Sequence, residues 1–333
     1  MREARGGHSL KNSLTYARDT SDDRTTALLK FAQSVYNAGW LGLSSRRPIG
    51  TNIFSRDWDA LVILDACRLD ALRELASEYP FLDTVDSMWS VGSATAEWTA
   101  KTFTSKYLDT IAETAYVSAN WYTKTVLIDH VYPPTDDILP FDWSRWDVVD
   151  AAYFAGLEGV WDWEDGYSER LHTIPASYVT DRAIARGRTG RHDRLIVHYT
   201  QPHVPYVGRG HAATRELRDV ELDPWPAFNR GEVSRSELWT LYLDNLRYVL
   251  DDVGVLLENL DAETVAITAD HGEAFGEWGA YAHPLGFPHP SVKRVPWALT
   301  TASDTGTREP AAVGTHDGTR VDQRQFLEDL GYL

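Results

Sequence analysis

Residues 60–65 read Ala-Leu-Val-Ile-Leu-Asp, and this short stretch is the main basis for predicting the fold class. Five apolar residues in succession predict a strand that is buried on both faces, as in a parallel sheet. Further apolar runs lie at 194–199 and 264–268, and the second of these follows an amphipathic helix expected at 236–260. Strands that alternate with helices predict an α/β sheet covered by helices on both faces.

The composition agrees with a folded protein that has a large core. The chain has 333 residues, of which 43% are hydrophobic, and a formal net charge of -17. Such a charge repels polyanions, so we expect no nucleic-acid partner. Lysine is scarce (6 against 26 arginines) and aspartate outnumbers glutamate 31 to 18. This bias predicts adaptation to high salt, and the simpler alternative is an acidic cytosolic protein.

We expect three parts along the chain: an N-terminal arm with an amphipathic helix at 1–55, a main domain at 56–300, and a tail at 301–333 that completes the domain. The helix, expected at 25–43, carries few basic residues and should pack on the body rather than on a membrane. No stretch approaches the ~18 apolar residues of a membrane span, and no signal-peptide pattern is visible. We therefore expect a soluble, cytoplasmic protein. Cys67 is the single cysteine, which excludes an intrachain disulfide.

Polar residues follow two of the predicted strands directly. Asp65 follows the first strand, and Asp270-His271-Gly272 follows the strand at 264–268. Ligands of α/β sheets gather beyond the carboxyl ends of strands, and carboxylate oxygens with an imidazole nitrogen can bind one divalent ion. For Asp65, the alternative is an N-cap of the next helix.

A loop of small residues, 90–98, leads into another predicted helix and offers three hydroxyl groups, those of Ser90, Ser93 and Thr95. Any of them is a candidate nucleophile if a metal ion stabilises its alkoxide. The alternative is an N-terminal capping box built on Ser93 or Thr95.

Histidines mark two further loops, 198–206 and 281–284. The first contains His198, Gln201 and His203, and the second contains His283. Imidazoles at strand ends can hold an anionic oxygen or protonate a leaving group, although an isolated histidine more often has a packing role.

The order of these motifs resembles the alkaline phosphatase and sulfatase superfamily. The resemblance spans about residues 56–300, and its matching segments are Val62-Ile63-Leu64-Asp65-Ala66-Cys67-Arg68-Leu69-Asp70-Ala71-Leu72, the loop at Thr95, Gln201-Pro202-His203-Val204-Pro205-Tyr206, the helix from Tyr242 to Leu257, Thr268-Ala269-Asp270-His271-Gly272-Glu273-Ala274-Phe275-Gly276-Glu277 and Arg294-Val295-Pro296. The loop at Thr95 is similar to the nucleophile loop of phosphoglycerol and phosphoethanolamine transferases. The resemblance implies a three-layer α/β/α sandwich with a central, mostly parallel sheet.

The resemblance also implies roles for single residues. Asp65, Asp270 and His271 would bind the metal, and Thr95 would be the nucleophile and touch the metal as well. Catalysis would further involve His203 and His283, which would hold the nonbridging oxygens or assist the leaving group. Substrate binding would involve Arg68, His198 and Gln201.

The sequence departs from the superfamily pattern in ways that concern the cofactor. The cysteine motif of formylglycine sulfatases, Cys-x-Pro-x-Arg, is missing, because Cys67 is followed by Arg68-Leu69-Asp70. A ligand set that includes imidazole favours zinc or manganese over calcium or magnesium. We expect one strong metal site, with a second site only if His203 and His283 are recruited.

The leading hypothesis is a metal-dependent hydrolase or transferase that acts on a phosphate ester through a covalent threonine intermediate. The substrate would be a small anionic ester, free or linked to a glycan or lipid. The first alternative is another enzyme, either a sulfatase that works without formylglycine or a phosphomutase. The second alternative is a degenerate protein that binds an anionic glycan or lipid headgroup without turning it over.

Overall fold

We describe the protein from a computed structural model. The structure describes residues 32, 35, 36, 39, 40, 42–44, 47–132, 146–162, 166–209 and 215–311. Most of the predicted N-terminal arm and the end of the predicted tail, 312–333, lie outside this part. The described residues among 32–44 are helical, as expected for the helix at 25–43. The division into three parts stays a prediction.

A seven-stranded sheet forms the centre of the protein, in the order β2-β9-β6-β1-β5-β3-β4. Its strands are β1 (Ala60–Leu64), β2 (Val85–Trp89), β3 (Thr114–Ser118), β4 (Gly156–Gly159), β5 (Arg194–Tyr199), β6 (Ala262–Thr268) and β9 (Arg294–Ala302). Strand β1 pairs in parallel with β5 and β6, and β3 pairs in parallel with β5 and β4, whereas β9 runs antiparallel to both β6 and β2. The fold class predicted from the sequence is therefore confirmed.

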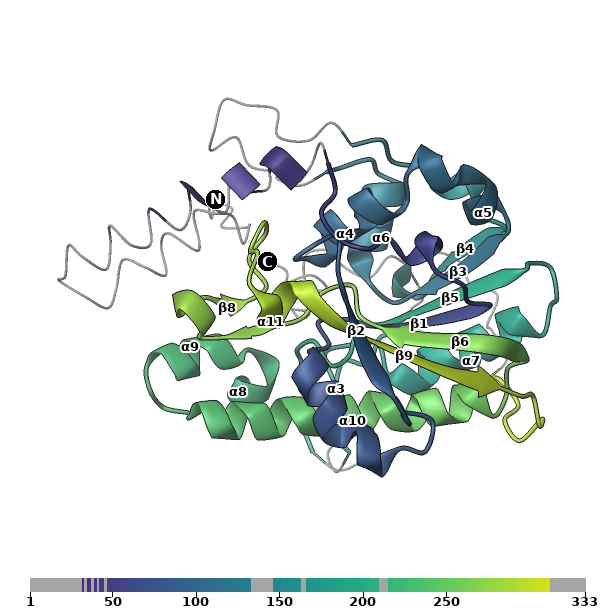
Figure 1. Cartoon of the computed structure of the whole chain (residues 1–333). Coiled ribbons are helices and arrows are strands. Elements are labelled where there is room, and N and C mark those ends of the chain that lie inside the picture. Colours follow the sequence, from purple (N-terminus) through teal and green to yellow (C-terminus); the bar gives the residue numbers. More distant parts are fainter. Residues whose placement is uncertain are drawn as a thin grey trace, which may run out of the picture.

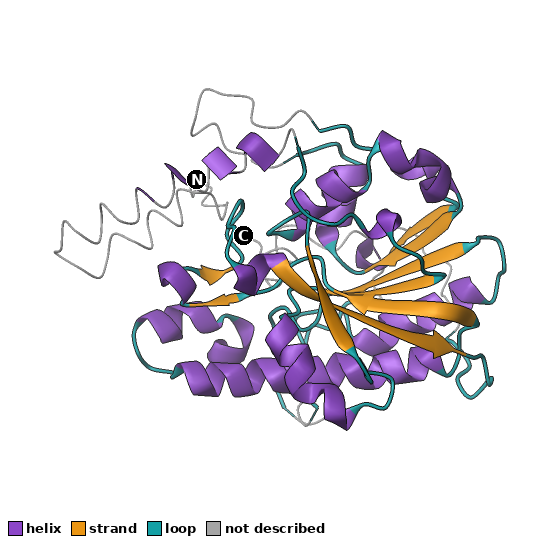
Figure 2. Ribbon diagram, in the orientation of Figure 1, coloured by secondary structure: helices purple, strands orange, loops and turns teal. Residues whose placement is uncertain are grey.

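Helices cover both faces of the sheet (Figure 1). One layer contains α4 (Thr95–Thr102), α5 (Leu108–Ala112) and α6 (Trp121–Leu127), and the other contains α3 (Leu69–Leu75), α7 (Ala176–Gly187) and α10 (Arg235–Leu257). Figure 2 shows the strands running between these two groups of helices. Further elements are α8 (Asp219–Leu222), α9 (Pro224–Asn229), α11 (Pro290–Lys293), a two-stranded hairpin of β7 (Ala274–Phe275) and β8 (Tyr281–Ala282), and several short 3-10 helices.

The sequence pattern explains the main elements. All five residues of β1 are buried, because neighbouring strands and both helical layers enclose it. The long helix α10 starts with a capping box, in which Ser234 and Glu237 satisfy each other's backbone N–H groups.

No helix in the described part of the chain is both long and apolar enough to cross a membrane.

The parallel strands place the functional candidates at one edge of the sheet. Strands β3, β5, β1 and β6 point the same way and end at Ser118, Tyr199, Leu64 and Thr268. Strand β2 runs in the same direction, since it is antiparallel to β9, and the loop that leaves it leads to α4. Residues that follow these strands are therefore neighbours in space, although up to two hundred positions separate them in the sequence.

Candidate functional site

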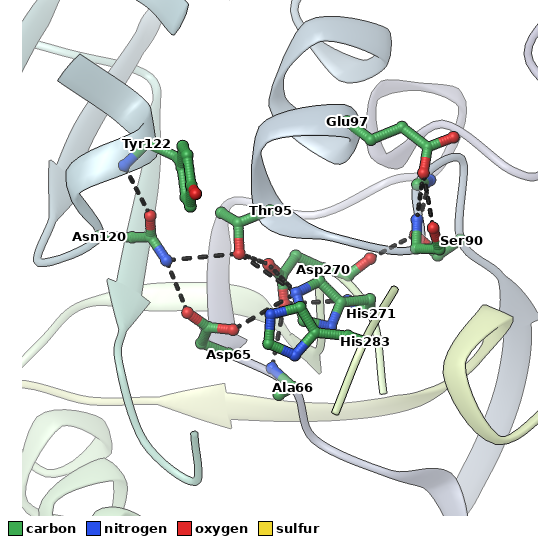
Figure 3. A network of polar contacts seen from close by, with 12 residues as sticks. Asp65, Ala66, Ser90, Thr95, Glu97, Asn120, Tyr122, Asp270, His271 and His283 are labelled. Atoms are coloured by element: carbon green, nitrogen blue, oxygen red, sulfur yellow. Dashed lines mark hydrogen bonds and ion pairs between the residues drawn. The ribbon is translucent and has the colours of Figure 1, made fainter. Parts of the chain in front are cut away.

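The nucleophile candidate Thr95 lies among the predicted metal ligands (Figure 3). Its Oγ1 donates a hydrogen bond to Asp270 Oδ2 at 2.7 Å and lies 3.2 Å from His271 Nε2. Thr95 is the first residue of α4, and Asp270 and His271 follow β6 after one residue. Thr95 is only 1% exposed. The structure thus brings together residues that the sequence places on two separate motifs.

Asp65 completes this group from the end of β1. Its Oδ1 lies 3.5 Å from His271 Nε2, and its Oδ2 accepts a hydrogen bond from Asn120 Nδ2 at 2.6 Å. The helix after Asp65 has Arg68 as its N-cap, so the alternative role of Asp65 as a helix cap is wrong. Asn120, which follows β3, also reaches Thr95 Oγ1 at 3.4 Å.

A local backbone feature orients Asp270. Ala66 adopts a left-handed φ of 60°, which is uncommon for a residue with a side chain. In this conformation its N–H donates to Asp270 Oδ1 at 3.2 Å, and the N–H of His271 donates to the same oxygen at 2.9 Å. With Oδ1 held by two backbone donors, Oδ2 faces Thr95 and His271.

The lone pairs in this group indicate a cation site. His271 Nδ1 lies 2.9 Å from the carbonyl oxygen of Gly272, a contact that needs a proton on Nδ1 and leaves a lone pair on Nε2. Burial, reinforced by His283, lowers the pKa of His271 well below its ordinary value, so the ring is neutral. Its Nε2 and one oxygen each of Asp65 and Asp270 lie within 4.8 Å of one another. Three buried acceptors that face one another are stabilised by a shared cation, and this donor set fits zinc or manganese.

A second group of metal-ligand type lies next to the first. His203, Glu273 and His283 offer ligand atoms that lie within 4.8 Å of one another. His203 Nδ1 lies 2.8 Å from the carbonyl oxygen of Val204, so the neutral ring presents the lone pair of Nε2. Burial and the neighbouring His283 lower the pKa of His203 well below its ordinary value. This tautomer suits a ligand better than a proton donor.

The two groups are adjacent. The ring centroids of His271 and His283 are 4.4 Å apart, and those of His203 and His283 are 5.0 Å apart. His283 Nδ1 lies 3.4 Å from Glu273 Oε1. The residue His283 is the least buried of the three in the second group. His283 is therefore the member of the second group that lies against His271 of the first group, and it is partly exposed.

The residues predicted to bind substrate are largely engaged with the protein. The guanidinium group of Arg68 donates to both oxygens of Asp70, to Glu277 and to the carbonyl oxygen of Glu273, which ties the β7–β8 hairpin to the end of β1. Gln201 is 1% exposed and donates to the carbonyl oxygen of Ile174. Direct contact of these side chains with a substrate stays a prediction.

His198, the third of these residues, is fully buried beside the first group. Its Nδ1 lies 2.8 Å from the hydroxyl of Tyr116. Its Nε2 lies 3.9 Å from Asp270 Oδ2 and has no hydrogen-bond partner among the described residues. Burial lowers the pKa of His198 to about 4, so the ring is neutral at pH 7.

The other hydroxyl groups of the loop 90–98 face away from the ligand cluster. Ser90 Oγ donates to the backbone oxygen of Asp270, and Ser93 Oγ donates to Glu97 Oε2 at 2.7 Å. Neither serine nor Thr95 caps α4, because the N-cap is Ala94, whose side chain makes no capping bond. Of the three candidates, Thr95 alone has its hydroxyl against the predicted ligands.

Two residues of the site, Asn120 and Glu273, were not identified from the sequence. Asn120 lies just beyond β3, whose five residues are all buried. Ligands gather at the carboxyl ends of strands, which is how Asp65 was found, and the same argument applies to Asn120. This strand contains Thr114 and Ser118 beside its apolar residues, so the sequence shows no continuous apolar run that would predict it. Glu273 belongs to the motif at Asp270, but sequence spacing alone gives no sign that it faces His203.

No protein-family model and no curated protein matches the sequence. Similar solved structures include the soluble domain of lipooligosaccharide phosphoethanolamine transferase A from Neisseria meningitidis (15% identity, TM-score 0.45, 74% of this chain and 76% of that chain). A second is the C-terminal periplasmic domain of EptC from Escherichia coli in complex with zinc (13% identity, TM-score 0.40, 77% and 76%). A third is a protein in the alkaline phosphatase superfamily from Vibrio parahaemolyticus (12% identity, TM-score 0.37, 81% and 69%). These proteins fall in the groups that the motifs resemble, but likenesses this distant assign no activity.

Proposed function

We propose that the protein is a metal-dependent phosphoester hydrolase or phospho-headgroup transferase that uses Thr95 as its nucleophile. The observation that carries this proposal is the position of the Thr95 hydroxyl, 2.7 Å from Asp270 Oδ2 and 3.2 Å from His271 Nε2. A hydroxyl that only stabilised the fold would not need to lie among three buried acceptors. A binding protein would need the ligand cluster but no hydroxyl inside it.

The side chains divide the chemical work among them. A divalent ion held by Asp65, Asp270 and His271 would favour the alkoxide of a nearby hydroxyl and neutralise an anionic ester. Thr95 Oγ1 would attack phosphorus and form a phosphothreonine, while the bond from phosphorus to the leaving-group oxygen breaks. The hydroxyl proton has Asp270 Oδ2 as its nearest acceptor. Attack by water or by an acceptor alcohol then releases Thr95 and completes hydrolysis or transfer.

Two histidines have distinct parts in this scheme. His283 is partly exposed and lies beside His271, so it is the better candidate to protonate the leaving group. His203 presents a lone pair beside Glu273, which suits recruitment of a second ion. The proposed substrate is a small anionic ester, and zinc or manganese is the proposed ion.

The test compares two identical substitutions on one helix. Thr95→Val removes the proposed nucleophile at nearly constant volume, and Thr99→Val is its matched control, because the buried Thr99 Oγ1 has no hydrogen-bond partner in the described part of the chain. Zinc-loaded wild type and both variants are assayed on an aryl phosphate monoester, an aryl phosphodiester and an aryl sulfate. Trapped protein is examined by mass spectrometry for an adduct on Thr95.

We expect the wild type and Thr99→Val to turn over a phosphate ester and Thr95→Val to be inactive, with a phosphoryl adduct on Thr95 in the active proteins. Faster turnover of the aryl sulfate would favour the sulfatase alternative. Zinc binding without turnover of any ester would favour the degenerate binder. Wild-type rates in Thr95→Val would show that the nucleophile is assigned wrongly.

A further inference from the structure

A buried carboxylate, that of Glu97, holds the loop that precedes the nucleophile. Glu97 is the third residue of α4, and its Oε2 accepts hydrogen bonds from both the backbone N–H (2.8 Å) and the hydroxyl (2.7 Å) of Ser93. In a capping box, the glutamate at this position bonds the N–H of the N-cap residue itself. Here the N-cap is Ala94, and Glu97 reaches one residue further back. Its carboxylate therefore fixes the turn that delivers Thr95.

The Ser93 hydroxyl connects this turn to the loop that carries His283. Ser93 Oγ accepts a hydrogen bond from the N–H of Phe287 at 3.2 Å and lies 3.1 Å from the carbonyl oxygen of Pro284. A hydroxyl has one proton, and the shorter contact directs it to Glu97. Glu97 thus orients a serine that links the loop of Thr95 to the loop of His283.

The negative charge of Glu97 attracts two buried lysines, Lys101 and Lys293. Glu97, Lys101 and Lys293 are each at most 2% exposed. Lys101 Nζ contacts Glu97 Oε1 and donates to Ser44 Oγ at 2.8 Å. Burial raises the pKa of Glu97, but the attraction of Lys101 and Lys293 outweighs it and lowers the pKa to about 2. Glu97 is therefore ionised at neutral pH.

Stability alone does not explain this cluster. Removing charges from water is costly, and a buried ion pair can often be replaced by apolar residues of similar volume without loss of stability. Here the carboxylate of the buried pair also accepts two hydrogen bonds from one loop residue, Ser93. These bonds fix the position of the loop, and an apolar pair could not form them.

We propose that Glu97 is a positioning residue, which acts through Ser93 to set the placement of Thr95 relative to His283. This inference rests on the proposed function. A displacement of reacting groups by 1 Å can lower a rate about 100-fold. If Glu97 has this role, its charge should mainly affect stability, and its hydrogen bonds to Ser93 should mainly affect kcat.

Two variants separate the charge from the hydrogen bonds. Glu97→Gln keeps an acceptor for Ser93 but leaves Lys101 and Lys293 without their counterion. The double variant Glu97→Met with Lys101→Met removes the ion pair at similar volume, but it leaves Ser93 without its acceptor and Lys293 without its counterion. The control is Asp181→Asn, which changes a buried carboxylate paired with Arg308 and in contact with no residue of the site described above.

The experiment measures the urea midpoint, kcat and KM of the zinc-loaded full chain, with the phosphate ester that the wild type turns over. We expect Glu97→Gln to lower the midpoint and to keep kcat near the wild-type value. We expect the double variant to lower the midpoint less than Glu97→Gln does, because one buried lysine rather than two lacks a counterion. Its kcat should fall about 100-fold, with little change in KM. Asp181→Asn should lower the midpoint without changing kcat.

A double variant whose kcat equals that of the wild type would overturn the inference, since the cluster would then serve stability alone. A kcat in Glu97→Gln as low as that of the double variant would also overturn it. If the wild type turns over no ester, the proposed function fails and this inference fails with it. If the wild type is active but the two variants do not differ in urea midpoint and kcat as expected, the positioning role alone is refuted.

Discussion

Replacing Asn120 by alanine is expected to weaken both the fold and the metal site. The side-chain oxygen of Asn120 caps α6 by accepting from the N–H of Tyr122 at 2.8 Å, and its Nδ2 donates to Asp65 Oδ2 at 2.6 Å. Loss of an N-cap costs ~1 kcal/mol. Loss of a hydrogen bond to a charged group costs ~1.5–3 kcal/mol. The free energy of unfolding of the metal-free protein should therefore fall by roughly 2.5–4 kcal/mol.

The same change should reduce metal affinity, because Asn120 orients the carboxylate of Asp65. Loss of a partner that holds a ligand in place lowers metal affinity about 10- to 100-fold. The assay is a zinc titration against a competing chelator, together with urea unfolding of the metal-free chain. Asn259→Ala is the matched control, since Asn259 also bonds buried backbone but lies beside Thr307, outside the site.

Asn120→Asp separates the two contributions. Aspartate caps a helix as well as asparagine does, so the bond to Tyr122 is kept, whereas the donor to Asp65 is replaced by a like charge. We expect Asn120→Asp to destabilise the metal-free protein mainly above pH 5, where both carboxylates are ionised. An Asn120→Ala variant with wild-type zinc affinity would refute the argument that Asn120 orients Asp65.

Three further measurements test the packing and the charges. Gly272→Ala should lower the free energy of unfolding by ~1–3 kcal/mol, because the added Cβ would meet the backbone oxygen of Ser291 at 2.2 Å. Gly254→Ala, within α10, should instead raise it by ~0.5–1 kcal/mol, since the new methyl group would lie 3.6 Å from Phe81; equal effects of the two changes would contradict both assignments. Burial, reinforced by Asp251 and Asp181 and opposed by Arg308, raises the pKa of Asp252 to about 7. The folded state then binds this proton more tightly than the unfolded chain, so stability falls as pH rises from about 4 to about 7. Asp252→Asn should leave stability unchanged at pH 4 and, allowing for partial exposure, raise it by roughly 1–2 kcal/mol at pH 8; an identical pH profile would refute this.

The strands that lie deepest were the easiest to predict from the sequence. The expected strands at 60–64 and 194–199 match β1 and β5, and the expected helix at 236–260 corresponds to α10 (Arg235–Leu257). These segments are buried on several sides, so their hydrophobic pattern is continuous or regular. Strands β2, β3, β4 and β9 were not predicted. Strand β2 is an edge strand of mixed polarity and β9 contains Pro296. Strand β3 is buried, but Thr114 and Ser118 interrupt its apolar pattern, and β4 contains two glycines.

Of the site residues, those that follow a recognised strand could be predicted. Asp65, Thr95, Asp270 and His271 do lie together, although their chemical roles stay predictions. The contact of Arg68 with Glu277 could not be foreseen, because it depends on where the β7–β8 hairpin folds back. Sequence spacing does not encode such contacts.

The central position of β1 also has a consequence for protein synthesis. Both neighbours of β1 are encoded far downstream, since β5 begins at residue 194 and β6 at residue 262. At a translation rate of ~5–20 residues per second, the second neighbour of β1 emerges from the ribosome about 10–40 s after β1 itself. During this interval an apolar strand has at least one open edge, on which it can pair with another nascent chain. We therefore expect that prematurely terminated chains lacking β6 aggregate, and that the ligand cluster forms only after β6 and the residues that follow it have been synthesised.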